Sequence, residues 1–382
     1  MSTITENLAN CATASVHAPK RLLYGPGPSQ VYPRIYQAMA QPLVGHLDPY
    51  FFQVSQEVQK GLRTVFGTKN ELTIPISATG SGGMETAVSN FIEPGTKLAL
   101  FVNGFFGERI CEMAKRHGAE IVRLEKPWGE TFSDDEAAEF IRRERPQVVA
   151  FVQAETSTGA FQQSKALCEA AHEVDAVVIA DCVTSLGAMP VDVDANGIDV
   201  AYSCTQKGLS APPGLSPITI SPRAQERLSQ RKQANRSWYF DLSLISDYLT
   251  ISHRYHHTAS ATLFYALHES LAIIEEEGLG LRQRRHQRAH ERFVAGVQRL
   301  GLAMKVAEGH RIWNLNTPCV PEGVNEPKVR AYLLEKHGIE IAGGFGPLAG
   351  KIFRIGIMGP LATDEGVDRF LAKFDEAMKE TA

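Results

Sequence analysis

The sequence predicts an α/β fold in which a mostly parallel sheet is flanked by helices, followed by a smaller C-terminal α+β domain. Short apolar segments alternate with helical segments, which is typical of a parallel sheet covered by helices. The expected strands are residues 98–101, 121–124, 148–152, 177–180 and 200–202, and helices are expected around 107–117, 134–144 and 164–174. The pattern changes at residues 242–260, after which a long helix at 261–277 and a charged helix at 281–300 precede a mixed section.

The length and composition suit two domains. The chain has 382 residues, of which 43% are hydrophobic and 21% charged, enough to form a large core. We expect an N-terminal arm at residues 1–22, a large domain at 23–260 and a small C-terminal domain at 261–382. Two further helices are expected early in the chain, at about 33–40 and 48–66, and the second is amphipathic.

The charge, the cysteines and the termini argue against several classes of protein. A formal net charge of −4 argues against a nucleic-acid or membrane-surface partner. No apolar stretch approaches the roughly 20 residues that span a bilayer, and residues 1–20 contain neither an arginine nor an apolar core typical of leader peptides. The six cysteines form no C-x-x-C pair, and residues 379–382 do not end in a peroxisomal tripeptide. We therefore expect a cytoplasmic protein.

A lysine follows the last of the expected strands in a loop of fixed shape. Residues 203–214 read SCTQKGLSAPPG, and their glycines and prolines forbid a regular helix. Lys207 is therefore held on a rigid backbone directly after a strand. Taken alone, a lysine in such a turn is most simply a surface residue.

A carboxylate ends the preceding expected strand, 26 residues before the lysine. Asp181 follows the apolar run 176–180, and alone it could be an N-cap of the next helix. Ligands of an open parallel sheet lie beyond the carboxyl ends of its strands, so Asp181 and Lys207 should converge on one crevice. Such a pair suits pyridoxal 5'-phosphate (PLP). The lysine forms a Schiff base with its aldehyde, and the aspartate keeps the pyridine nitrogen protonated.

These motifs resemble those of the class V aminotransferases. The resemblance rests on residues 181–187 (DCVTSLG), 205–207 (TQK) and 211–214 (APPG), and runs from about Gly25 to about Gly359. It implies a PLP-dependent transferase of fold type I, with Lys207 and Asp181 catalytic. The substrates it implies are a small L-amino acid, alanine before others, and glyoxylate, which would give pyruvate and glycine. Serine–glyoxylate or serine–pyruvate and (S)-ureidoglycine–glyoxylate transamination are the alternatives.

The resemblance also assigns cofactor-binding residues. Residues 79–85 (TGSGGME) open a helix with glycines, which lets backbone N–H groups reach a phosphate. The resemblance gives Ser81, Gly82 and Gly83 to the PLP phosphate. It gives three further residues to the cofactor: Phe106, with Phe105 as a competing choice, for stacking on the ring, Thr156 for the ring oxygen, and Gln206 beside the lysine.

A Tyr-His-His-Thr segment implies a partner subunit. Adjacent histidines share no face of a strand or helix, and no suitably spaced third ligand accompanies them, so we expect no metal here. In the resembling family the tyrosine and threonine reach the cofactor phosphate of the other subunit. Tyr255 and Thr258 therefore imply a homodimer with shared active sites.

An arginine in the last expected strand is assigned to the substrate. In residues 351–359 (KIFRIGIMG), two-residue alternation puts Phe353, Ile355 and Ile357 on one face. Arg354 then shares the other face with Gly356, which we expect to leave space beside it. A guanidinium matches a carboxylate bidentately, and the resemblance gives Arg354 to the α-carboxylate of the amino acid. A structural salt bridge is the alternative. Gly25, in the Gly-Pro-Gly-Pro turn, is expected near the same carboxylate.

Other activities fit the sequence less well. The ureidoglycine type favours Asn where Tyr255 stands and Gln where His46 stands, so both positions favour alanine. A cysteine desulfurase would have His before the lysine and a cysteine on a Ser/Gly-rich loop, whereas Gln206 and Cys319 stand here in other contexts. A nicotinamide-dependent dehydrogenase would need a glycine where Glu85 stands, and a regulator would need an added DNA-binding segment.

A run of seven basic side chains is interpreted as a solvated helix face. It extends from Arg282 to Arg292, acidic residues precede it, and no aromatic residue interrupts it.

Overall fold

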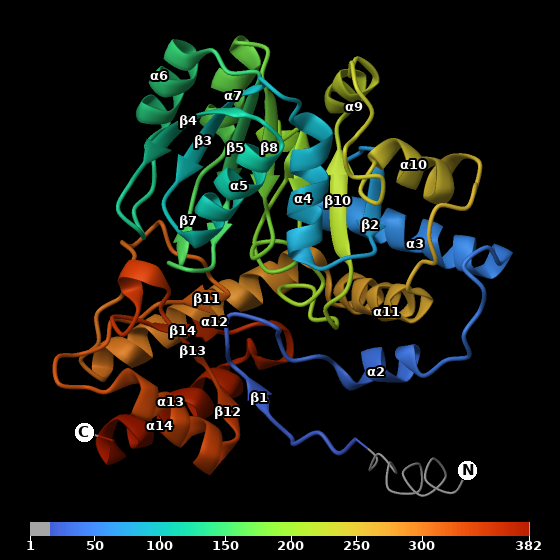
Figure 1. Ribbon diagram of the computed structural model, residues 1–382. Coiled ribbons are helices and arrows are strands. Elements are labelled where there is room, and N and C mark those ends of the chain that lie inside the picture. Colours follow the sequence, from blue (N-terminus) through green and yellow to red (C-terminus); the bar gives the residue numbers. More distant parts are fainter. Residues whose placement is uncertain (1–15, 382) are drawn as a thin grey trace, which may run out of the picture.

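The computed structural model describes residues 16–381, and its centre is one large sheet (Figure 1). Within these residues the sheet has seven strands in the order β2-β10-β9-β8-β5-β3-β4. Among them, β10 runs antiparallel to both of its neighbours and the other pairs are parallel. The strands are β2 (Thr73–Ile76), β3 (Lys97–Val102), β4 (Glu120–Glu125), β5 (Val148–Val152), β8 (Val177–Asp181), β9 (Val200–Tyr202) and β10 (Ser216–Ile220). The α/β prediction is confirmed, and residues 1–15 of the expected arm lie outside the described residues.

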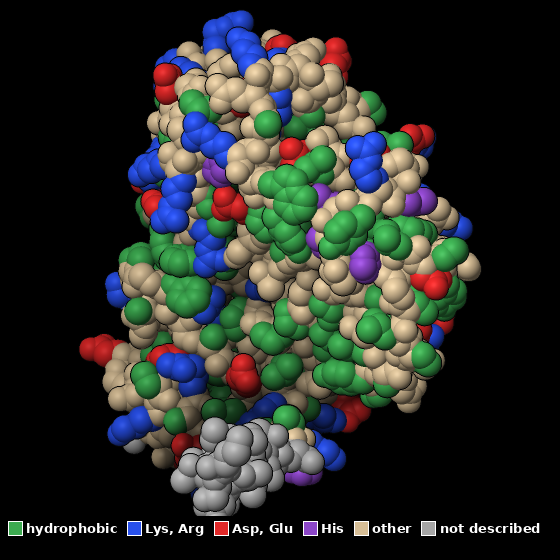
Figure 2. Space-filling model, turned by 45° about the vertical axis from the view of Figure 1, so that its right-hand side comes forward, with side chains coloured by type: hydrophobic (Ala, Val, Ile, Leu, Met, Phe, Trp, Pro, Cys, Tyr) green, Lys and Arg blue, Asp and Glu red, His purple; other side chains and the backbone are tan. Residues whose placement is uncertain are grey.

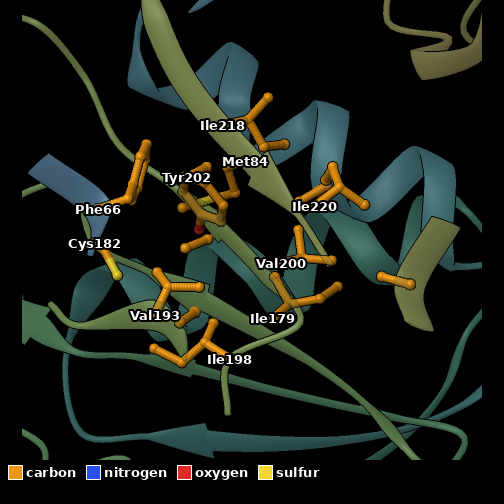
Figure 3. Packing of buried hydrophobic residues seen from close by; sticks show 14 of the residues in the cluster. Phe66, Met84, Ile179, Cys182, Val193, Ile198, Val200, Tyr202, Ile218 and Ile220 are labelled. Atoms are coloured by element: carbon orange, nitrogen blue, oxygen red, sulfur yellow. The ribbon is translucent and has the colours of Figure 1, made fainter. Parts of the chain in front are cut away.

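Helices accompany this sheet, and all except α2 (Pro33–Met39), which buries Ile35 in a separate small cluster, bury residues in one continuous apolar core with it. The helices are α2, α3 (Pro49–Phe66), α4 (Gly80–Phe91), α5 (Phe105–Arg116), α6 (Asp134–Glu144), α7 (Lys165–Glu173), α8 (Val193–Asn196), α9 (Pro222–Ser229), α10 (Leu242–Ser246), the π-helical turn η1 (Asp247–Ile251) and α11 (Ala261–Glu277). Figure 3 shows part of the core, where Met84 of α4 packs with residues of three strands, such as Ile179, Val200 and Ile218. Within residues 16–381, no helix has the length and hydropathy needed to cross a membrane.

All five strands predicted for the large sheet are present, and two strands of that sheet were missed. Both missed strands, β2 and β10, contain a proline, and Pro75 pairs with Pro217 across them. Proline lowers the expectation of a strand because it cannot donate a backbone hydrogen bond. β2 lies at the edge of the sheet, where a proline is tolerated.

The C-terminal residues form the smaller α+β part, lower in Figure 1. Strand β14 (Phe353–Gly356) lies between β11 (Leu315–Asn316) and β13 (Ala342–Gly343), antiparallel to both. The helices are α12 (Leu279–Arg299), α13 (Glu326–His337) and α14 (Asp364–Glu380), with 3-10 turns η2 (Gly346–Leu348) and η3 (Gly359–Leu361). The remaining short strands are β1 (Leu22–Leu23), β6 (Ala154–Glu155), β7 (Ala160–Phe161) and β12 (Ile339–Glu340). Phe353, Ile355 and Ile357 are buried in a second apolar cluster, as the alternation predicted.

The two parts of the molecule are joined by segments that pack into both apolar clusters. Tyr24 lies in the C-terminal cluster, 4.9 Å from the ring of Phe370, and its hydroxyl donates to the carbonyl of Gly366 at 2.8 Å. Helix α11 buries Phe264, Leu267 and Ile274 in the core of the large sheet. The division into residues 1–22, 23–260 and 261–382 stays a prediction.

The prediction of a solvated face on α12 is wrong for part of the basic run. Arg282 and His286 are fully buried and His290 is nearly so, whereas Arg284 and Arg288 are exposed. The buried residues lie four apart, so they share one face of the helix. This face is continued by Phe293 and Val297, which are also buried.

The prediction that Gly356 leaves space beside Arg354 is also wrong. A methyl group on Gly356 would overlap the carbonyl oxygen of Gly25, because the two backbones are in direct contact. The amide of Gly356 donates to the carbonyl of Tyr24 at 2.7 Å. Gly356 therefore lets the segment around Gly25 lie flat on β14.

We expect Gly356→Ala to lower the free energy of unfolding by about 1–3 kcal/mol, since the added methyl must displace backbone. Gly45→Ala is the matched control, because a methyl group there meets nothing within 4 Å. Denaturant unfolding of both variants measures the difference, and equal stability of the two would contradict the packing described here.

Candidate active site

Lys207 lies in a buried loop and is covered by the Gly-Pro-Gly-Pro turn. Its side chain is 8% exposed, and Nζ donates a hydrogen bond to the carbonyl of Pro26. A Cβ on Gly27 would stand 2.8 Å from both Cδ and Cε of Lys207, and Gly27 has a φ of 120°. A glycine is thus required where the turn crosses the lysine. The sequence predicted Gly25 of this turn near the substrate carboxylate; the contacts of Pro26 and Gly27 with Lys207 were not predicted.

Asp181 ends β8 beside the strand that leads to Lys207. Its Oδ1 accepts from the amide of Val183 at 2.9 Å, and its Oδ2 accepts from the hydroxyl of Tyr202 at 2.9 Å. Because β8 and β9 are parallel neighbours, the carboxylate and the lysine loop leave the sheet at the same edge. The predicted convergence is observed. Tyr202, which orients the carboxylate, was missed because a tyrosine in a strand is ordinarily a core residue.

Burial shifts the pKa values of both groups toward neutrality. Burial raises the pKa of Asp181 to about 6, against the hydrogen bonds from Val183 and Tyr202, which lower it. Burial, together with the charge of Arg354, lowers the pKa of Lys207 to about 8. The charges of Asp181 and Lys207 influence each other. The amine is therefore available in its neutral form at a much lower pH than an ordinary lysine.

A second buried carboxylate, Glu155, was not predicted. It accepts backbone hydrogen bonds from Phe106 at 3.0 Å and Gly107 at 3.3 Å, and from the Ser157 hydroxyl at 2.6 Å. It therefore caps the start of α5, and its burial raises its pKa. A Cβ on Gly104 would overlap Glu155. The pairing of Gly104 with an acid after β5 could have been found only from the three-dimensional arrangement.

Phe105 and Phe106 are the first two residues of α5, and Arg109 lies near both of their rings. The guanidinium carbon of Arg109 lies 4.7 Å from the ring centroid of Phe106 and 5.1 Å from that of Phe105. Arg109 also donates to the hydroxyl of Ser81 at 2.9 Å, which links this turn to the start of α4. The ring of Phe105 lies 5.2 Å from Phe345 of the C-terminal part. Arg109 was not predicted.

The glycines at the start of α4 are required for packing. A Cβ on Gly82 would overlap Ala78, and one on Gly83 would overlap the hydroxyl of Ser216. Thr79 is the N-cap residue of α4, and its side chain makes no capping hydrogen bond within the described residues. The first turn of α4 therefore lies close against its neighbours and presents an uncapped positive end.

Two further predicted residues lie among these loops. Gln206 precedes the lysine, and its Oε1 is buried without a hydrogen-bond partner in the part of the chain that the structure describes. The hydroxyls of Thr156 and Thr184 form a hydrogen bond of 2.6 Å, which joins the loops after β5 and β8. Thr184 lies within the motif that sequence reasoning singled out, but it was not chosen.

Arg354 is a buried guanidinium with free donors. It is 4% exposed, Nε donates to the carbonyl of Gly343 at 2.6 Å, and its terminal nitrogens bond no residue between 16 and 381. Burial lowers its pKa to about 10. The ring of Phe345 covers it, with 3.8 Å between the guanidinium carbon and the ring centroid. Arg354 is also close enough to Lys207 and Glu155 for the charges to influence one another.

Tyr255 and Thr258 are exposed and lie outside this cluster. Tyr255 is 57% exposed, and its ring lies 5.2 Å from that of His46. His257, the neighbour of Thr258, forms a hydrogen bond of 2.8 Å between its Nε2 and Ser77 Oγ. Burial lowers the pKa of His257 to about 4. Within residues 16–381, no group of three acidic, cysteine or histidine side chains is arranged to hold a metal ion.

These residues fit PLP. The amine of Lys207, whose pKa is lowered by burial, suits the aldehyde. The buried carboxylate of Asp181 has unused lone pairs and suits the pyridine nitrogen. The uncapped end of α4 suits its phosphate, since backbone N–H groups there need an acceptor that the described residues do not supply.

Comparison with known proteins gives consistent matches over the whole chain. Residues 21–370 match the family described as Aminotransferase class-V. The chain is 40% identical over 369 residues to an alanine–glyoxylate aminotransferase of Drosophila melanogaster, covering 95% of this chain and 94% of that protein. It is 36% identical over 378 residues to the (S)-ureidoglycine–glyoxylate transaminase of Bacillus subtilis (strain 168), covering 94% and 91%. The structure of an alanine–glyoxylate aminotransferase from Nostoc sp. superposes with a TM-score of 0.95 at 42% identity, covering 97% and 98%.

In the cofactor-free protein, we expect Lys207 to react with a small acylating reagent at a rate that levels off above about pH 8. The reason is that only the neutral amine reacts, and burial lowers its pKa to about 8. Mass spectrometry of the peptide that contains Lys207 measures this rate. An ordinary lysine would follow a pKa of about 10.4, so a rate that still rises above pH 10 would contradict the described burial.

Proposed function

The chain belongs to the class V aminotransferase family, and from this we propose that it transfers the amino group of L-alanine to glyoxylate, giving pyruvate and glycine. It is an enzyme, an aminotransferase. The observation that carries the proposal is the buried pair of Lys207 and Asp181 on neighbouring strand ends, with the free donors of Arg354 beside it.

PLP is the proposed cofactor. When bound, it supplies an aldehyde that bonds amines and a ring that withdraws electrons from the reacting carbon. Asp181 would face its pyridine nitrogen, and Phe106 its ring. Thr156 would face the ring oxygen. Ser81, Gly82, Gly83 and Gln206 would hold its phosphate.

Lys207 is proposed to carry the proton. Its lowered pKa makes the neutral amine accessible near pH 8, so it can take a proton from the α-carbon of the amino acid. The amine would pass this proton to the aldehyde carbon of the cofactor, and in the glyoxylate half-reaction it would move a proton from that carbon to the α-carbon of glycine. Asp181 stays in place for this step because Val183 and Tyr202 fix its two oxygens.

Arg354 is proposed to bind the substrate carboxylate, beside the segment of Gly25. Its two terminal nitrogens have no partner among residues 16–381, so they could donate to both oxygens of a carboxylate. Phe345 stacks on the guanidinium and contacts Phe105. This aromatic cover limits the room beside the carboxylate and favours a donor with a small side chain.

One contact supports alanine over ureidoglycine as the donor. The two positions that distinguish these types, His46 and Tyr255, lie against each other with ring centroids 5.2 Å apart. The two residues therefore form one contact, and both are those that the resemblance associates with the alanine type. Ureidoglycine–glyoxylate and serine–glyoxylate or serine–pyruvate transamination remain the second candidates.

A homodimer with shared active sites is proposed as the working form. Tyr255 and Thr258 are exposed, and Trp238 and Ile251 near them are exposed apolar residues, 60% and 72% respectively. Figure 2 shows hydrophobic side chains gathered beside histidines on one face of the molecule. A partner that covered this face would receive Tyr255 and Thr258 at its own site. A cytoplasmic location is proposed from the sequence features alone.

A half-reaction panel tests the function. The PLP-loaded protein is mixed separately with L-alanine, L-serine, L-cysteine and (S)-ureidoglycine while the cofactor absorbance is followed, and glyoxylate is then added. We expect alanine to remove the absorbance fastest and glyoxylate to restore it, and Lys207→Ala to lose turnover. Reaction with cysteine alone, with release of sulfide, would overturn the proposal, and a fastest reaction with ureidoglycine would support the second candidate.

Pairing two inactive subunits tests the shared sites. A heterodimer of one Lys207→Ala subunit and one Tyr255→Ala subunit contains one site with both residues intact, so we expect about half of the wild-type activity. Two different affinity tags isolate it. Activity no higher than the mean of the two parent homodimers would show that Tyr255 acts within its own subunit or not at all.

A further inference from the structure

One fully buried arginine connects the two loops that carry Asp181 and Lys207. Arg282 of α12 donates from Nε to the carbonyl of Gly187 at 2.9 Å, and from Nη2 to the carbonyl of Gly208 at 2.8 Å. Gly208 is the neighbour of Lys207, and Gly187 lies in the loop that follows Asp181. The same guanidinium therefore binds one backbone carbonyl in each of the two loops.

The two loops meet in direct backbone contact at this point. A Cβ on Gly187 would stand 3.1 Å from the carbonyl carbon and oxygen of Gly208, and one on Gly208 would overlap the carbonyl of Leu186. Two carbonyl oxygens converge here without access to water. Both need a donor, and the planar fork of an arginine supplies one from each of two nitrogens held at a fixed separation, whereas a lysine has a single donor nitrogen.

The loop that follows Arg354 is held by the same helix. Arg285 donates from Nη1 to the carbonyls of Gly359 and Ala362, both at 2.8 Å. The amide of Gly359 donates to Nε2 of His286 at 3.2 Å, so the Nδ1 of His286 carries the proton that it donates to the carbonyl of Arg282 at 2.8 Å. Both ring nitrogens of this buried histidine are thereby used.

The third loop also touches the lysine loop directly. A Cβ on Gly359 would overlap the hydroxyl of Ser210, and Ser210 is a second, longer contact of Arg282 at 3.4 Å. The loops that follow Asp181, Lys207 and Arg354 thus meet on one face of α12.

Glu277, the last residue of α11, balances these cations. Glu277 accepts from Arg282 at 3.0 Å and from Arg285 at 2.6 Å. Burial alone would raise the pKa of Glu277, but its bonds and charge contacts with Arg285 and Arg282 lower it. The carboxylate stays ionised and keeps the two guanidinium groups oriented.

We propose that Arg282 is a positioning residue for catalysis, which fixes the amine of Lys207 relative to the carboxylate of Asp181. It touches neither substrate nor cofactor and acts through the carbonyls of Gly187 and Gly208. The inference rests on the proposed function, since it names what holds that site in register. Loss of the fork lets the two loops separate and admits water to the amine.

The test compares Arg282→Met and Arg282→Lys with Arg284→Met in the full-length protein. Arg284 lies on the same helix and is exposed, so its variant controls for the loss of a positive charge. We expect kcat to fall about 100-fold in Arg282→Met, since small misplacements of reacting groups have effects of this size. KM for the amino acid should change less, because Arg354 remains. Arg282→Lys should not restore kcat.

A second readout needs no turnover. In the cofactor-free variants, the pH dependence of Lys207 acylation should move upward for Arg282→Met and Arg282→Lys, and stay unchanged for Arg284→Met. A kcat of Arg282→Met within twofold of the control, with an unchanged Lys207 profile, would overturn the proposal. If Arg282→Met does not fold, Arg282→Lys decides on the same criteria. A wild-type protein that transaminates no donor would refute the proposed function, while the acylation profiles would still test the positioning role.

Discussion

The structure depends on the placement of two ionisable side chains where water is excluded. Asp181 and Lys207 leave the sheet on neighbouring parallel strands, and burial moves both pKa values toward neutrality. Isolated buried charges are costly, so the surrounding residues must supply hydrogen bonds. Tyr202 and Val183 do so for the carboxylate, and the turn at Pro26 does so for the amine.

Close approach of backbone segments follows from the same requirement. Gly27 crosses over the lysine, Gly83 brings α4 against β10, and Gly208 lets the lysine loop lie on the loop after Asp181. Each contact excludes a side chain that would hold the loops apart. The loops then contain carbonyls that no strand or helix satisfies, and arginine from α12 satisfies two of them. The site is therefore supported by the C-terminal part of the chain as well as by the sheet.

The central elements could be predicted from the sequence because their signals are local. An apolar run that ends in Asp181, and a Gly/Pro-shaped loop around Lys207, predicted that the two side chains leave the sheet at the same edge. Glu155 and Gly27 could not be predicted, since their roles appear only when distant segments meet. Arg282 was misinterpreted for a different reason. A run of basic residues indicates a solvated face. However, Arg282, His286, Phe293 and Val297 are separated by four, seven and four residues, which puts them on one face of the helix. The two apolar residues identify this face as the buried one.

The measurement that tests the account most directly is the site of covalent attachment of PLP. The protein is incubated with PLP, reduced with borohydride and digested, and the peptides are analysed by mass spectrometry. We expect one phosphopyridoxyl group, on Lys207, and its loss in a Lys207→Arg variant. Labelling of another lysine at equal occupancy, or no labelling at all, would contradict the assignment of this crevice as the catalytic centre.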